Sequence, residues 1–232
     1  MQSLGFNNLI VSNDIFSPDI LCSTMEFAVE HGFRRIFFLL NYDPITEPLS
    51  FHIDKKKKIC SILKNIKPRG VYSQVYTNLL LDKDTAYQKQ IRRLSVRKTD
   101  FLFTELPLFS ACRDWIDPTL NYLLYTQKKK LVFVSFEKVI ASYDYELLDH
   151  LMKTRLSAFM IDINSFSNPN AIPYIKKLIE SNVVIIPGMS GVMENYANLS
   201  DKIEYFKKNV GQPLFSKMLV NSSKSSQLIF GV

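Results

Sequence analysis

Residues 158–187 read AFMIDINSFSNPNAIPYIKKLIESNVVIIP, and their pattern predicts a strand, a helix and a second strand. The runs Ala158–Asp162 and Asn182–Pro187 are mostly apolar, which is typical of strands buried on both faces. Between them, the asparagine–proline pair at 168–169 predicts the start of a helix that ends near residue 180. Parallel strands need such a crossover, so this stretch indicates a parallel α/β sheet.

The same alternation continues along the rest of the chain. Further strands are predicted where short runs rich in Val, Ile, Phe and Tyr occur, at Asn8–Ser12, Arg35–Leu40, Val71–Val75, Phe101–Glu105 and Leu131–Ser135. Seven strands with intervening helices and no break in composition predict one α/β domain over residues 1–232. Its parallel strands either close into a barrel or open into a doubly wound sheet.

Helical segments are predicted between the strands. Ser17, Pro18 and Asp19 form an N-cap, a first-turn proline and an early carboxylate, and Gly32 ends the helix that they begin. Further helices are expected over about residues 51–65, 117–127, 143–154, 170–180 and 194–208. The polar, basic stretch 77–99 breaks the alternation and is expected to be an inserted segment or lid.

Length and composition restrict the class of protein. The chain has 232 residues, of which 47% are hydrophobic and 22% charged, and this argues for a real core and against disorder. No apolar run reaches the roughly 20 residues of a membrane span, and the N-terminus lacks a basic leader. Cys22, Cys60 and Cys112 have neither disulfide-framework nor zinc-site spacing. We therefore expect a soluble, cytoplasmic protein.

The formal net charge of +7 raises the question of a nucleic-acid partner. Basic residues concentrate at 55–58, 92–98 and 128–130. Such clusters can hold phosphates, and the aromatic content of 12% could supply stacking surfaces. Because the clusters lie far apart in the chain, we interpret them as solvated surface and do not expect nucleic acid as the partner.

Reactive groups of parallel α/β proteins gather at the C-terminal ends of the strands. The predicted strand ends carry small polar and acidic side chains: Ser12, Asp14, Asn41, Asp43, Gln74, Glu105, Ser135, Glu137, Asp162, Asn164, Gly188 and Ser190. The three histidines fall on predicted helices instead, where surface or capping roles are expected. No glycine-rich phosphate loop is present.

Several stretches together resemble a known family. They are Asn8–Ile15, Glu30–Ile36, Leu39–Tyr42, Val71–Tyr76, Arg93–Leu106, Leu131–Lys138, Met160–Phe166, Val184–Ser190 and Pro213–Phe230. In this order they resemble the capsule- and exopolysaccharide-associated tyrosine phosphatases of Gram-positive bacteria, which are manganese-dependent members of the PHP superfamily. The resemblance implies a single distorted (β/α)7 PHP-type, TIM-like barrel and a link to capsular or exopolysaccharide biosynthesis.

The chain departs from that family at the positions that would hold metal. Where the resemblance implies histidine, aspartate or glutamate ligands, the chain has Ser12, Asp14, Asn41, Gln74, Ser135, Gly188 and Ser190, and among the carried-over ligands only Glu105 is kept. Hydroxyls and amides neither neutralise nor strongly coordinate a cluster of divalent cations. We therefore expect no metal and no cofactor. The positions Ser12, Asp14, Asn41, Gln74, Glu105, Ser135, Asn164 and Ser190 are expected to bind a ligand.

Three functions follow from this interpretation. The favoured one is a catalytically inactive or strongly impaired barrel that binds or regulates, with a protein or phosphopeptide of the polysaccharide machinery as partner. The second is a metal-dependent tyrosine phosphatase, or another phosphoester or glycoside hydrolase, whose chemistry has moved to Asp14, Glu105, Glu137 and Lys138. The third is an RNA-associated PHP-like subunit, supported only by the basic segment 92–98.

Overall fold

A computed structural model gives the fold of the chain. It describes residues 5–43, 46–66, 70–80, 102–105, 130–134, 149, 158–191 and 198–225, and the side chains of 78–80, 102–105, 130–134 and 225 are not described. Within these residues no helix combines the length and the apolar character that crossing a membrane requires.

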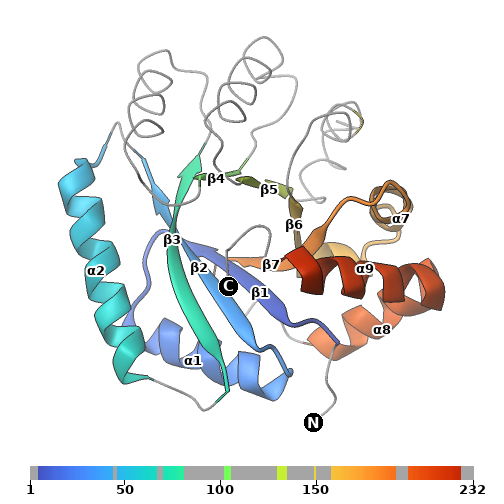
Figure 1. The fold of residues 1–232 in the computed structure, drawn as a ribbon, viewed down its shortest axis with the longest axis horizontal. Coiled ribbons are helices and arrows are strands. Elements are labelled where there is room, and N and C mark those ends of the chain that lie inside the picture. The colour runs from blue at the N-terminus through green and yellow to red at the C-terminus, as the bar shows by residue number, and fades with distance from the viewer. Residues whose placement is uncertain are drawn as a thin grey trace.

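Parallel strands close into a barrel (Figure 1). The described part of the chain contains seven of them: β1 (Asn8–Asn13), β2 (Arg35–Tyr42), β3 (Tyr72–Leu80), β4 (Leu102–Glu105), β5 (Lys130–Val134), β6 (Ala158–Asp162) and β7 (Ile185–Ser190). Each strand pairs with the next along the chain, and β7 pairs with β1, so that no strand edge is left open. The predicted α/β barrel is confirmed.

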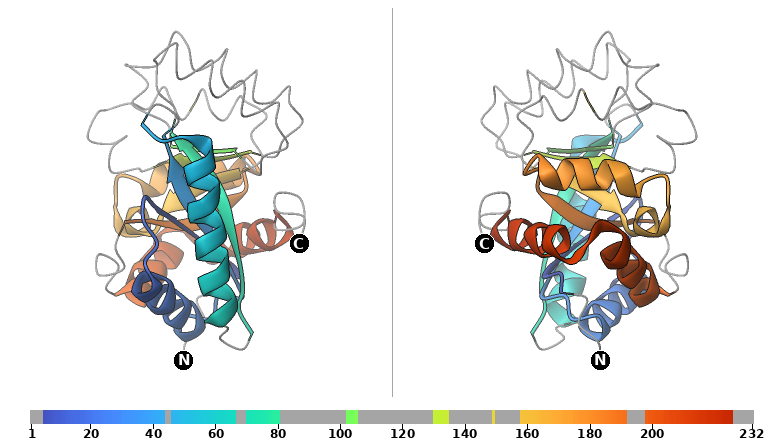
Figure 2. Two further views of the ribbon diagram at one scale, coloured as in Figure 1. Left: turned by 90° about the vertical axis from the view of Figure 1, so that its left-hand side faces the viewer. Right: turned by 90° about the vertical axis from the view of Figure 1, so that its right-hand side faces the viewer.

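Helices cover the outside of the barrel. The described helices are α1 (Pro18–Glu30), α2 (Leu49–Asn65), the 3-10 helix η1 (Ile163–Ser167), α7 (Ile172–Glu180), α8 (Leu199–Val210) and α9 (Gln212–Ser225). Figure 2 shows α1 and α2 on one side, against β1–β3, and α7, α8 and α9 on the side of β6 and β7. The start of α1 is as predicted, with the Ser17 hydroxyl accepting a hydrogen bond from the backbone N–H of Ile20.

Several element boundaries differ from the prediction, most clearly those of β3 and β7. Strand β3 does not end at Val75 but continues to Leu80, because Tyr76 and Thr77 alternate inward and outward like the residues before them. Residues 77–80 therefore belong to a strand and not to an insertion. Strand β7 begins and ends three residues later than expected. The helices predicted over 117–127 and 143–154, and the rest of the segment 77–99, lie outside the described residues.

The alternation of side chains along the strands produces two apolar layers. One set points into the barrel and forms a small inner cluster of Ile10, Phe37, Leu39, Tyr76, Ala158, Met160 and Ile186. The other set, which includes Leu9, Phe38 and Phe159, packs outward against the helices in a larger cluster. The strands are apolar on both faces for this reason.

Gly188 is a packing position in the inner layer. Its Cα lies between β6 and β1, and a Cβ on this residue would be 2.3 Å from Cγ and 2.6 Å from Sδ of Met160. The Met160 side chain thus fills the space that any larger residue at 188 would need. Gly188, which the sequence places at a strand end, is therefore a packing position, because the barrel interior is filled at this point.

His52 anchors α2 to the barrel. Its side chain is only 1% exposed, its Nε2 forms a 3.0 Å hydrogen bond with Thr77 Oγ1 on β3, and its ring lies 4.5 Å from that of Tyr42. Burial lowers the pKa of His52 to about 4, against partial opposition from Glu47. The expected surface role is wrong for His52. His31, by contrast, does lie at the C-terminal cap of α1, and His150 is outside the described residues.

Replacing Gly188 tests the packing of the barrel interior. We expect Gly188→Ala to lower the free energy of unfolding by about 1–3 kcal/mol, as overpacked core substitutions do. In a Met160→Ala background the same substitution should cost much less, because the clashing atoms are gone. Urea unfolding of the four proteins in this cycle measures the coupling, and equal costs in both backgrounds would contradict the packing.

The buried imidazole predicts acid sensitivity. As pH falls from about 6.5 towards 4, His52 becomes protonated in the unfolded state but stays neutral in the folded state. Folding stability is therefore lost over this pH window. Between pH 7 and pH 4, the free energy of unfolding of the wild-type chain should fall by up to about 3 kcal/mol more than that of the His52→Gln variant. Urea unfolding at each pH measures this, with His31→Gln as the matched control. A His52→Gln chain with unchanged pH dependence would contradict it.

Candidate functional site at the barrel mouth

Polar side chains from β1 and β2 meet at the C-terminal end of the barrel. Ser12 Oγ donates a 2.9 Å hydrogen bond to Asn41 Oδ1, and Asn41 Nδ2 donates a 2.7 Å bond to Asp14 Oδ1. Ser12 is buried, whereas Asp14 is exposed. The amide of Asn41 is thereby held in one orientation, with its oxygen towards the barrel and its nitrogen towards the rim.

A second polar group comes from β6, β7 and the helices that follow them. Ser190 Oγ donates to Asp162 Oδ2 at 3.2 Å, and the backbone N–H of Asn164 donates to Asp162 Oδ1 at 2.8 Å. The side chain of Asn164 in turn accepts a 2.6 Å hydrogen bond from Lys202 Nζ on α8. Asp162 is only 6% exposed, and it acts as the N-cap of η1.

Closure of the barrel joins the two groups. Ser12 on β1 and Ser190 on β7 are partners in the strand register, and the backbone N–H of Gly191 donates to the Ser12 carbonyl at 3.1 Å. A single polar rim, which we call the mouth arc, therefore runs across the ends of four neighbouring strands. Its members are Asp14, Asn41, Ser12, Ser190, Asp162, Asn164 and Lys202.

The two ends of the mouth arc carry opposite charges. At one end the exposed Asp14 carboxylate uses one oxygen for Asn41, and its other oxygen has no partner within the described residues. At the other end the half-buried ammonium of Lys202 donates to Asn164, whose side-chain amide nitrogen is likewise unpaired there. The rim thus offers a ligand one acceptor, the second carboxylate oxygen of Asp14, and two donors, the Lys202 ammonium and the Asn164 amide nitrogen.

The other residues predicted for the site have different positions. Gln74 is the third residue of β3, far from its C-terminal end, and accepts a 3.1 Å hydrogen bond from Tyr72 Oη. Asp43 organises the turn before α2, where it accepts from Thr46 Oγ1 at 2.9 Å. Glu105 ends β4, but its side chain is not described. Ser135, Glu137 and Lys138 lie outside the described residues, so their roles stay predictions.

Lys202 is the member of the mouth arc that sequence analysis missed. It lies on the first helix turns after β7, and the starts of such helices face the C-terminal end of a barrel. That position was the available signal, although the local sequence LSDKIEYF gives no motif. In the described part of the chain no three carboxylate, imidazole or thiol side chains come together as metal ligands would.

Comparisons with known proteins give the fold and no family. No family model matches the chain, and no curated protein matches it significantly. Among solved structures, an amidohydrolase from Burkholderia ambifaria with bound zinc matches with a TM-score of 0.56 at 10% identity, covering 90% of this chain and 67% of its own. A truncated 3-deoxy-D-arabino-heptulosonate 7-phosphate synthase from Thermotoga maritima matches with a TM-score of 0.50 at 12% identity, covering 94% and 88%. The shared feature is a TIM-barrel-type α/β fold.

These findings overturn the resemblance to the PHP phosphatases. These two matching structures are an amidohydrolase and a 3-deoxy-D-arabino-heptulosonate 7-phosphate synthase, and neither is a PHP phosphatase. Several of the short stretches behind the resemblance contain the strands β1, β2, β6 and β7, a kind of element that many α/β barrels share. The expected link to capsule or exopolysaccharide biosynthesis depended on that resemblance and has no other support.

The structural role of Asp162 can be tested by mutation. We expect Asp162→Ala to lower the free energy of unfolding by about 1–3 kcal/mol, because it removes the cap of η1 and the acceptor of Ser190. Asp162→Asn should cost less, since its amide oxygen still accepts the Asn164 N–H. Urea unfolding compares both with Asp201→Ala, an exposed aspartate on α8. If Asp162→Ala matches that control, the carboxylate does not hold the rim together.

Proposed function

We propose that this chain binds a small, hydroxyl-rich ligand carrying an anionic group, such as a sugar phosphate or a sugar acid, at the mouth arc. The observation that carries the proposal is the run of hydrogen bonds from Asp14 to Asn41 and Ser12, and from Ser190 through Asp162 to Lys202. Parallel barrels place their ligand sites at this end of the strands, which supports the location.

The arc is prearranged for ligand hydroxyls. Asn41 and Asn164 are held through their side-chain oxygens, and Asp14 through one carboxylate oxygen, so these groups lose little freedom when a ligand arrives. A ligand hydroxyl can donate to the open oxygen of Asp14, and a ligand oxygen can accept from the Asn164 amide. Asp162 would act as a positioning residue, because its carboxylate is occupied by Ser190 and the cap of η1.

The charge of Lys202 selects the anionic group. An ammonium that is half-buried and already oriented by Asn164 offers its remaining N–H groups to a phosphate or carboxylate. Asp14 would repel the same anion, so the ligand is oriented with its anionic end at α8 and its hydroxyls at β1. This polarity distinguishes the proposed ligand from a neutral sugar. Hydrolysis through Asp14, Glu105, Glu137 or Lys138 stays a prediction.

Isothermal titration with a panel of sugar phosphates, sugar acids and the matching neutral sugars tests the proposal. We expect at least one anionic member to bind and its neutral counterpart to bind at least about tenfold more weakly, the ratio that loss of one charge-assisted hydrogen bond produces. Lys202→Met should abolish this preference, and Asp14→Ala should weaken anionic and neutral members alike.

The matched control is Lys207→Met, which changes a lysine of the same helix that pairs with Glu204. It should leave binding unchanged. The absence of binding across the panel, or a preference for anions that Lys202→Met preserves, would contradict the proposal.

A further inference from the structure

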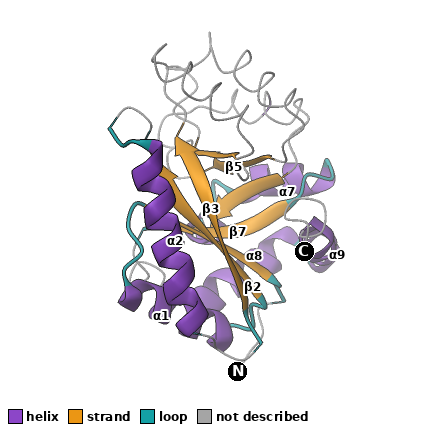
Figure 3. Ribbon diagram, turned by 60° about the vertical axis from the view of Figure 1, so that its left-hand side comes forward, coloured by secondary structure: helices purple, strands orange, loops and turns teal. Residues whose placement is uncertain are grey.

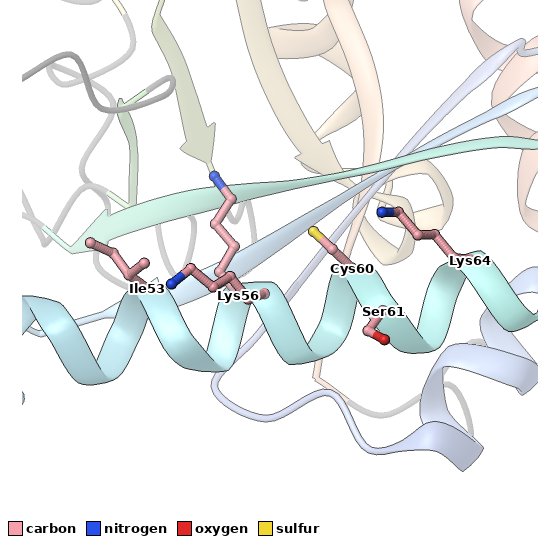
Figure 4. Close-up of a pocket in the computed structure, with 6 residues that line it drawn as sticks. Ile53, Lys56, Cys60, Ser61 and Lys64 are labelled. Carbon is pink, nitrogen blue, oxygen red and sulfur yellow. The ribbon is translucent and has the colours of Figure 1, made fainter.

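A basic groove runs along α2, away from the barrel mouth. It has a volume of about 470 Å³, and the described residues that line it are Ile53, Lys56, Lys57, Cys60, Ser61 and Lys64. These residues recur every three or four positions, so they form one stripe along the helix. Figure 4 shows Cys60 and Lys64 projecting from the same side of α2, with the Lys64 side chain extending back along the helix towards Cys60.

This stripe borders the face that holds α2 on the barrel, and Cys60 is partly buried against the core at that border. The buried residues of α2 are His52, Ile59 and Leu63, which face the strands (Figure 3 shows α2 alongside β3). The N-terminal part of the stripe is apolar and accessible, because Ile53 is 40% exposed and the neighbouring Phe51 is 61% exposed. Large apolar side chains beside a groove are typical of interaction surfaces.

The groove has excess positive charge. Helix α2 contains five lysines and one acidic residue, Asp54, in the sequence LSFHIDKKKKICSILKN. Lys57 pairs with Asp54 on the exposed surface, at 3.2 Å, and such pairs add little stability. Lys64 has no carboxylate partner within the described residues. Burial lowers the pKa of Lys56, so the ammonium group of this lysine is partly desolvated.

We propose that the α2 groove docks an acidic, amphipathic helix of a protein partner. Lys57 and Lys64 are two helical turns apart, about 10.5 Å along the axis, and glutamates seven residues apart on a partner helix have the same separation. An apolar side chain between those glutamates would contact Cys60, and one about a turn before the first glutamate would contact Ile53. The helix would therefore lie along α2, with its acidic stripe over the lysines and an apolar residue over the groove floor.

Other anionic partners fit the groove less well. Nucleic-acid surfaces combine cations with aromatic or arginine stacking, and neither residue type is among the described residues lining the groove. A membrane surface is planar, whereas the lysines that line the groove follow the axis of one helix. A protein helix lying along α2 matches the mixture of positive charge and apolar surface in the groove.

Fluorescence anisotropy with a synthetic helix tests the docking. The probe is a labelled peptide of about 20 residues built from alanine, leucine and glutamate, with glutamates repeating every three or four residues. The control peptide has glutamine in their place. We expect the acidic peptide to bind, added salt to weaken it, and the glutamine peptide to bind at least about tenfold more weakly.

Two charge-matched variants locate the site. Lys57→Glu with Lys64→Glu should reduce affinity for the acidic peptide at least about tenfold. Lys207→Glu with Lys208→Glu, on α8, makes the same charge change elsewhere and should reduce it less than about twofold. Equal losses in the two variants would show a response to net charge alone and would overturn the proposal.

The alkylation rate of Cys60 in the wild-type chain tests the docking without relying on a variant that has to fold. The acidic peptide should slow alkylation of Cys60 in the groove and leave Cys22 on α1 unaffected. Parallel titrations use single-stranded RNA and vesicles of phosphatidylserine. If either of these protects Cys60 and the acidic peptide does not, the partner class is wrong and the proposal is overturned.

Discussion

Pairing of β1 with β7 is the constraint on which the rest of this structure depends. Without it, Ser12 and Ser190 would lie at opposite edges of an open sheet, and the mouth arc would be two unrelated polar groups. The closure requires tight packing at the seam. Gly188 supplies it, because the absence of a side chain leaves room for Met160 in the barrel interior. A packing detail near the barrel axis thus determines which polar groups meet at the rim.

The rim separates structural from exposed polar groups. Asp162 is buried, and its carboxylate accepts hydrogen bonds from Ser190 and from the backbone N–H at the start of η1. It therefore stabilises the rim and does not present an exposed charge to a ligand. Asp14 and Lys202 keep unused hydrogen-bonding capacity at the two ends of the arc. Rigid strand ends hold these groups apart, and this fixed separation of charge is what a polar ligand would recognise.

Much of the fold was predictable because apolar strands, capped helices and their alternation are local signals. The start of α1 at Ser17 and Pro18, and the strand β6, follow directly from such signals. Pairings across the chain were not predictable in the same way. Gln74 was placed at the wrong end of β3 because the strand continues into polar residues, and neither Lys202 nor the buried contact of His52 with Thr77 has a local signature. The family resemblance failed because short strand motifs recur among unrelated barrels.

Ligand binding at the mouth arc is tested most directly by a crystal structure of this protein with the tightest-binding sugar phosphate or sugar acid bound. We expect the anionic group to lie within hydrogen-bond distance of Lys202 Nζ and a ligand hydroxyl to donate to Asp14. We also expect the hydrogen bonds of Asp162 with Ser190 and Asn164 to be unchanged. A ligand seated elsewhere, for example on the lysines of α2, or one that binds at the mouth in the reverse orientation, would contradict the proposal.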